Sequence, residues 1–131
     1  MSVDPNLYSP FPGLQLPKLK SYSKNSKALN VKEVDDLFHD LKLSKHAWRV
    51  VDNLEICRSY SPSDYLSGLE FVQYLAVAAE HCDHHPEIHF SYRQIEIRWH
   101  THFVKGLHFN DLVMAKYSDE LFAALSEGSS T

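Results

Sequence analysis

Glycine, cysteine and clustered positive charge are all scarce in this chain of 131 residues, and each scarcity excludes a class of protein. With four glycines, the chain offers no glycine-rich loop to bind a phosphate group. Its two cysteines, Cys57 and Cys82, are too few for a disulfide framework, so we expect reduced thiols and a cytoplasmic protein. The net charge is −4 and no predicted element carries a run of Lys or Arg, so direct nucleic-acid binding is not expected.

Long hydrophobic runs are also absent. No stretch approaches the roughly 20 apolar residues that span a bilayer, and the first residues lack the charged and apolar regions of a secretory signal. We therefore expect no membrane association. The residues that are present, 44% hydrophobic and 12% aromatic, are enough to fill one small core, so the chain predicts a single folded domain.

Prolines are concentrated in residues 1–29, which hold four of the six. Because proline resists both helices and central strands, this segment is predicted to be a flexible or loosely docked N-terminal arm. Its four lysines leave open an organellar presequence, although the segment lacks arginine and contains Asp4. The folded domain is then expected over residues 30–125, with a frayed tail at 126–131.

A capped helix and a hairpin are predicted at the start of the domain. Asn30 and Glu33 match a capping box, and apolar residues then recur at helical spacing over about 31–42. Asp52 and Asn53 tolerate turn geometry and join two β-prone runs into a hairpin. These runs cover residues 48–51 and 54–60.

A second helix is predicted after Ser61, with this residue as its N-cap and Pro62 at its first position. It must stop before Pro86, because the residue preceding a proline is pushed out of the helical region. Its apolar stripe steps by three and four residues. The stripe consists of Leu66, Leu69, Val72, Leu75, Ala76 and Ala79.

The last third of the chain predicts two more strands and a helix. Residues 88–92 and 95–102 alternate with period two, and Asn110 or Asp111 can cap a helix that runs to about residue 125. In the second strand, one face carries Glu96, Arg98, His100 and His102. The order α-β-β-α-β-β-α predicts an α+β fold of two layers, a four-stranded antiparallel sheet with helices on one face.

Histidine is the residue that the chain has in excess. Six of the nine histidines lie between His81 and His102. Imidazole, with an ordinary pKa of about 6.5, can both give and take a proton near neutrality, so the cluster is a candidate proton-transfer site. His39, His46 and His108 lie outside it and are interpreted as structural or exposed.

The cluster belongs to a longer motif, Glu80-x3-His84-His85-Pro86-x5-Tyr92-x9-His102-x8-Asp111. This motif resembles the signature of the pterin-4a-carbinolamine dehydratases. The element order, Trp48 near the first strand, Ala79 before Glu80 and Thr101 before His102 also match that family, so the resemblance covers about residues 30–125. Two features depart from it: Ile88 stands where the family often has an aromatic residue, and the arm has no obvious counterpart.

The resemblance implies loss of water from a 4a-hydroxytetrahydropterin to give the quinonoid dihydropterin of tetrahydrobiopterin recycling, with no cofactor and no metal. It implies that His84, His85 and His102 form the active site. We expect His84 and His102 to exchange protons with the leaving hydroxyl and N5, and His85 to orient the pterin. Which histidine is the acid and which the base stays open.

Several neighbours are expected to support these histidines. Pro86 restricts the loop, and Glu80 or Asp83 could accept a hydrogen bond from an imidazole, although either could equally be a solvated acid or a turn former. Trp48 could form a flat wall of the pocket or belong to the core. Thr101 is expected beside the substrate.

Two other functions stay open. A zinc site is a weaker alternative, because His81, Cys82 and the three motif histidines offer nitrogen and sulfur ligands. A non-enzymatic interaction protein or coactivator is the other, because members of the family assemble as dimers or tetramers and bind helical partners. We expect a homodimer or homotetramer in either case.

Overall fold

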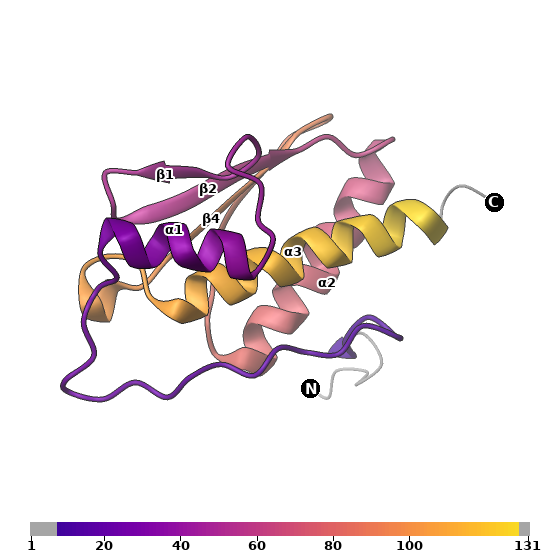
Figure 1. The fold of residues 1–131 in the computed structure, drawn as a ribbon. Helices are drawn as coiled ribbons and strands as arrows, with labels where there is room; N and C mark the ends of the chain where they lie inside the picture. Colours follow the sequence, from indigo (N-terminus) through magenta and orange to yellow (C-terminus); the bar gives the residue numbers. More distant parts are fainter. Residues whose placement is uncertain (1–7, 129–131) are drawn as a thin grey trace.

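Four antiparallel strands and three helices form two layers in residues 8–128, the part of the chain that the computed structural model describes (Figure 1). The predicted α+β class and element order are confirmed. The elements are α1 (Val31–Asp40), β1 (Arg49–Val51), β2 (Glu55–Tyr60), α2 (Tyr65–Cys82), β3 (Glu87–Phe90), β4 (Ile95–His100), the short 3₁₀ helix η2 (His102–Val104) and α3 (Phe109–Gly128).

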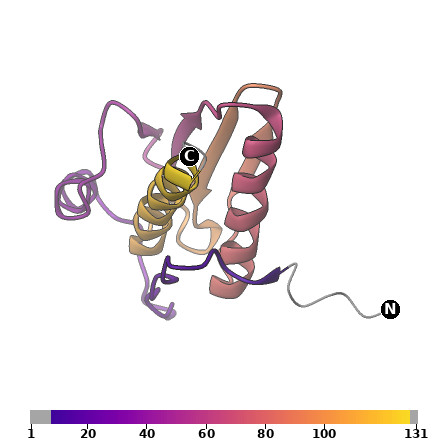
Figure 2. The ribbon, with the colours of Figure 1, turned by 90° about the vertical axis from the view of Figure 1, so that its right-hand side faces the viewer.

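The sheet has the order β1-β2-β4-β3, with every neighbouring pair antiparallel. Along β4, the buried residues Ile95, Ile97 and Trp99 alternate with half-buried polar residues, as the period-two pattern predicted. The helices lie on one side of the sheet, with α3 against β4 and α2 against β3 (Figures 1 and 2). The core therefore lies between the two layers.

The capping box and the hairpin form as predicted. The Asn30 side chain accepts a hydrogen bond from the Glu33 backbone at 2.8 Å, and the Glu33 carboxylate accepts one from the Asn30 backbone at 3.0 Å. Asp52 and Asn53 both have positive φ, 53° and 56°, and Leu54 N donates to Val51 O at 2.9 Å, so the chain turns at these two residues between β1 and β2.

The start and the buried face of α2 differ from the prediction. The N-cap is Asp64, whose side chain accepts from Ser67 N at 2.8 Å, so α2 begins three residues later than a Ser61 cap would place it. Gly68 determines which face of α2 packs on the sheet, because a Cβ at this position would lie 3.0 Å from the Phe90 ring. The face that contains Gly68 and Phe71 therefore packs on the sheet, and three residues of the expected stripe are exposed. They are Leu66, Leu69 and Ala76.

The fourth strand is also shorter than predicted. β4 ends at His100, Thr101 makes an isolated bridge to Gly106, and His102 begins η2. His102 therefore does not continue the outward face of the strand. In the last helix, the chain remains helical through Gly128, so residues 126–128 are not frayed; residues 129–131 of the expected tail lie outside the described residues.

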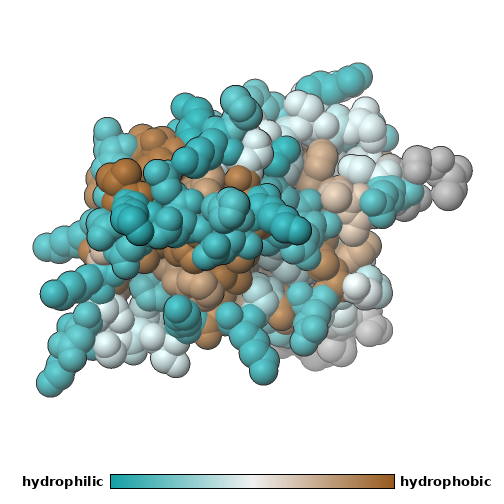
Figure 3. Space-filling model, viewed as in Figure 1, coloured by the Kyte–Doolittle hydropathy of each residue, from teal (hydrophilic) through white to brown (hydrophobic). Residues whose placement is uncertain are grey.

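The N-terminal segment, residues 8–29, follows a defined path past α3 and the C-terminal end of α2 (Figures 1 and 2). It contains no strand, and Phe11 packs edge-on against Tyr74 of α2 with ring centroids 5.1 Å apart. Residues 1–7 lie outside the described part, and the flexibility of the arm stays a prediction. In Figure 3, hydrophilic side chains cover α1, with hydrophobic surface visible above and below it. Within residues 8–128, no helix has the length and apolar content to cross a bilayer.

One carboxylate ties α3 to the sheet. Asp119 accepts hydrogen bonds from Trp48 Nε1 at 3.0 Å, Arg58 Nη1 at 2.8 Å and the Tyr60 hydroxyl at 2.5 Å.

We expect Asp119→Ala to lower the free energy of unfolding by about 2–4 kcal/mol, because three partly buried donors lose their acceptor. Urea denaturation measures this loss. Glu120→Ala, an exposed change one residue away, should stay within about 0.5 kcal/mol of wild type, and equal stabilities for both variants would contradict the prediction.

Candidate functional site

A cavity of about 940 Å³ opens at the end of the sheet where β4 stops. It is bounded by the β1–β2 turn, the loop between α2 and β3, the η2 segment and Tyr22 of the N-terminal arm. Six of the residues expected in the site line it: Asp83, His84, His85, Pro86, Thr101 and His102. The fold thus brings the loop after α2 and the segment after β4 to one cavity.

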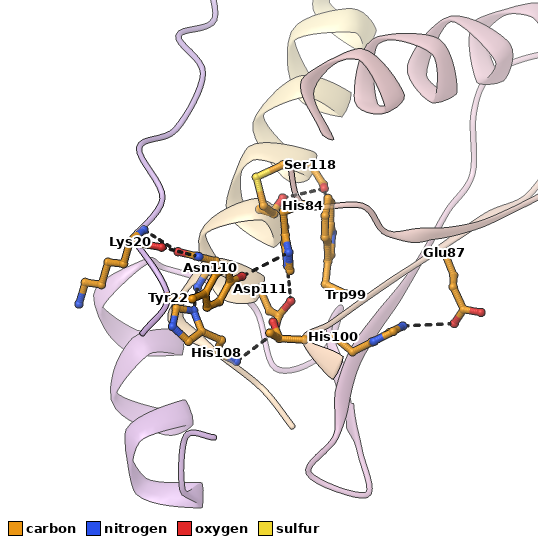
Figure 4. Close-up of polar contacts among 12 residues, drawn as sticks. Lys20, Tyr22, His84, Glu87, Trp99, His100, His108, Asn110, Asp111 and Ser118 are labelled. Carbon is orange, nitrogen blue, oxygen red and sulfur yellow. Dashed lines mark hydrogen bonds and ion pairs between the residues drawn. The ribbon is translucent and has the colours of Figure 1, made fainter. Parts of the chain in front are cut away.

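His84 is the most constrained of these residues. Its Nε2 lies 2.6 Å from Asp111 Oδ1, and its ring stacks on Trp99 with centroids 5.6 Å apart and planes 16° apart (Figure 4). Because an ionised carboxylate only accepts, Asp111 selects the tautomer with a proton on Nε2. The other nitrogen, Nδ1, is then left with a lone pair, 3.5 Å from the Tyr22 hydroxyl.

Asp111 is fully buried, and both of its oxygens are hydrogen-bonded. Beside the contact to His84, Oδ2 accepts from Thr101 Oγ1 at 2.7 Å and from the backbone N–H of His108 at 2.9 Å. The prediction that Asn110 or Asp111 caps the last helix is wrong, because α3 begins at Phe109 and both residues lie in its first turn. Asp111 instead accepts from the backbone N–H of His108, the residue before the helix. Its contact with His84 was missed, although its place at the end of the motif was a signal.

His85 lies on the exposed side of the same loop. Its Nε2 is 2.8 Å from Glu80 Oε1, so of the two acids expected beside an imidazole, Glu80 is the one that contacts His85. Asp83 instead adopts a left-handed conformation with φ 52° as the C-cap of α2. This turn and Pro86 redirect the chain from α2 into β3, which separates the buried His84 ring from the exposed His85 ring.

His102 is exposed at the start of η2. Its ring packs edge-on against that of His100, with centroids 4.2 Å apart. His100, on the polar face of β4, also lines the cavity, and its Nε2 is 3.9 Å from Glu87 Oε2 (Figure 4). Four imidazoles therefore lie along this cavity, two on the loop after α2 and two where β4 ends.

Trp48 does not line the cavity, and of the two interpretations left open for it, the core is confirmed. The Trp48 side chain is 1% exposed and its indole N–H is bonded to Asp119, on the helix side of the sheet. The aromatic residue beside the site is Trp99, which supports His84 from below the cavity surface. Tyr92, the other aromatic residue of the motif, is exposed in the turn between β3 and β4 and does not line the cavity.

The expected zinc ligands do not come together. His84 Nε2 is bonded to Asp111, His81 Nε2 contacts Tyr8 O at 3.1 Å, and the Cys82 thiol points to Pro17 O. Within residues 8–128, one group of three potential ligands has donor atoms within 4.8 Å of one another: Glu55, Glu87 and His100. Arg98 already forms an ion pair with Glu55, which opposes a cation there, so we assign no metal to this group.

The electrostatics disfavour thiol chemistry. Burial raises the pKa of Cys57 and Cys82, and both are unpaired, so neither thiol is activated as a nucleophile. Burial also lowers the pKa of His108, against the opposing effect of Asp111, which favours its neutral form. Its Nδ1 accepts from the backbone N–H of Asn110 at 3.1 Å. His108 is therefore a structural support beside the site.

The fold and the cavity define a small α+β protein with an imidazole-lined site suited to proton transfer. Comparison with known proteins identifies the family. The sequence model of the family described as pterin 4 alpha carbinolamine dehydratase matches residues 27–121, most of the chain. The chain therefore belongs to this family, as the motif predicted.

Individual relatives agree. A protein of Cupriavidus pinatubonensis (strain JMP 134 / LMG 1197), named "Putative pterin-4-alpha-carbinolamine dehydratase 1", is 38% identical over 82 residues, which are 62% of this chain and 71% of that protein. A protein of Herpetosiphon aurantiacus named for the same activity is 36% identical over 61% of this chain and 82% of its own. A crystal structure from Brucella melitensis, titled transcriptional coactivator/pterin dehydratase, matches with a TM-score of 0.64 at 27% identity, over 72% of this chain and 98% of that chain.

Proposed function

We propose that the protein is a 4a-hydroxytetrahydropterin dehydratase that acts in tetrahydrobiopterin recycling. The observation that supports this most directly is that His84, His85 and His102 line one cavity. They come from two separate segments, because His84 and His85 precede β3 and His102 follows β4. Three imidazoles around an open cavity suit a reaction that needs a proton donor and a proton acceptor and no redox partner. The two unpaired cysteines agree with a cytoplasmic location.

The reaction breaks the C4a–O bond, removes the proton of N5 and forms the C4a=N5 double bond, with water as the second product. It needs a proton on the departing oxygen and an acceptor for the N5 proton, and no electrons are exchanged with another molecule. In this proposal His84 Nδ1 and the exposed imidazole of His102 carry out the two transfers. His85, held by Glu80, orients the flat ring of the pterin.

Asp111 has a positioning role in this mechanism. Its contact with His84 Nε2 directs Nδ1 toward the cavity, and its bonds to Thr101 and His108 hold the carboxylate itself in place. A ring with a fixed tautomer and orientation loses little entropy when the substrate arrives. The site is in this sense built before the ligand binds.

The activity is tested with purified protein and freshly generated 4a-hydroxytetrahydropterin, by following dehydration against the spontaneous rate. We expect wild type to accelerate the reaction, and His84→Ala and His102→Ala each to lose at least about tenfold in kcat/KM, because general acid or base catalysis contributes about 10²- to 10⁴-fold. His46→Ala is the control, because His46 is exposed and does not line the cavity. Equal rates for wild type, both site variants and buffer would reject the dehydratase.

A second role, as an oligomeric interaction protein, is favoured by one surface. The residues of α2 that turn away from the sheet include two exposed apolar side chains, Leu66 at 72% and Leu69 at 45% exposure. The neighbour from Brucella melitensis carries the word coactivator in its title. We propose that this face of α2 is buried in a homodimer or homotetramer, which leaves the cavity free for catalysis; a helical protein partner is the alternative occupant.

Light scattering coupled to size-exclusion chromatography tests the assembly. The proposal predicts a mass of two or four times the 15.1 kDa chain for wild type, and the monomer mass for a Leu66→Lys, Leu69→Lys double variant, because two charges cannot be buried without partners. Val31→Lys, at an exposed position of α1, serves as the matched control and should keep the wild-type mass. A monomeric wild type would be evidence against self-association.

A further inference from the structure

The arm is fixed to the domain next to the candidate site. Asn110, which is fully buried at the start of α3, accepts from the Lys20 backbone N–H at 2.8 Å and donates to the Lys20 carbonyl at 2.9 Å. At the C-terminal end of the arm, the backbone N–H of Leu29 donates to the carbonyl of Leu107 at 2.8 Å. Two backbone attachments therefore define the course of residues 20–29, and Figure 4 shows the arm beside α3 at Asn110.

Tyr22 lies two residues after the first attachment and lines the cavity. Its ring packs on His108, with centroids 4.6 Å apart, and on Phe103, with centroids 6.0 Å apart. Its hydroxyl lies 3.5 Å from His84 Nδ1 (Figure 4). Contacts with His108 and Phe103 thus hold the ring with its hydroxyl near the nitrogen of His84 that Asp111 leaves free.

The position of this hydroxyl matters because His84 Nδ1 is the atom that the proposed reaction uses. A ligand oxygen that meets Nδ1 also comes within reach of the Tyr22 hydroxyl, which can donate a hydrogen bond to it. Hydrogen bonds of catalytic groups are often long before the substrate binds, and a separation of 3.5 Å leaves the hydroxyl free to change partner. Its proton suits an oxygen that gains negative charge as it departs, because such an oxygen is stabilised by a hydrogen-bond donor.

We propose that Tyr22 is a further catalytic residue of the dehydratase site: its hydroxyl donates a hydrogen bond to the departing 4a oxygen beside His84, and its ring closes the cavity. This inference rests on the proposed function and extends it to a residue outside the family's shared region, because the family match begins at residue 27. The proline-rich arm thereby gains a purpose. It delivers one side chain to a site that the rest of the domain leaves open on that side.

The test compares Tyr22→Phe and Tyr22→Ala with wild type in the full chain. Tyr22→Phe keeps the ring and removes the hydroxyl, so we expect kcat to fall about fivefold to tenfold with KM within about twofold of wild type, the effect of one lost hydrogen bond in the transition state. Tyr22→Ala also uncovers the cavity, so its KM should rise as well. The melting temperature and the affinity for a stable 7,8-dihydropterin are measured for each variant.

Tyr8→Phe is the matched control, because it makes the same change in the same arm at an exposed tyrosine that does not line this cavity. If wild type is active and Tyr22→Phe matches Tyr8→Phe, the role of Tyr22 is wrong while the dehydratase stands. A wild type that does not accelerate the reaction rejects both. If the kcat of Tyr22→Phe falls and its melting temperature and its affinity for dihydropterin fall as well, Tyr22 has a structural role and the inference is overturned.

Discussion

The site depends on the buried carboxylate of Asp111. Its two oxygens accept from His84 of the loop after α2, Thr101 at the end of β4 and the backbone of His108 before α3. Three segments that are distant in sequence are thus held at one point inside the protein. A buried carboxylate is costly unless its hydrogen bonds are satisfied, so each of these partners stabilises the arrangement of the others.

The two layers of the fold supply what this carboxylate needs. The pairing of β4 with β2 and β3 brings Trp99 beneath the His84 ring, and α3 crosses β4 so that its first turn reaches the same end of the sheet. Gly68 lets α2 approach the sheet closely, which sets where the histidine loop emerges. In the proposed mechanism, the exposed histidines His85 and His102 contact the ligand from positions that these elements set.

The sequence predicted most of the fold because its signals are local. The capping box at Asn30, the turn at Asp52 and Asn53 and the alternation along β4 each act within a few residues, and all three are confirmed. The prediction of the buried face of α2 was wrong because that face depends on a tertiary contact, the close approach of Gly68 to Phe90. In the site, the motif identified the histidines, but the partner of His84 is 27 residues away and Tyr22 is 62 residues away, separations that no periodicity reports.

The tautomer of His84 tests this account most directly. Long-range ¹H–¹⁵N correlation spectra of the histidine side chains, recorded at a pH where the rings are neutral and assigned by the loss of one signal in His84→Gln, distinguish a protonated from an unprotonated ring nitrogen. The account predicts a proton on Nε2, bonded to Asp111, and a bare Nδ1 that faces the cavity. A His84 ring protonated on Nδ1 and bare on Nε2 would contradict it, because Asp111 Oδ1 would then lose its donor and His84 would offer the cavity no acceptor.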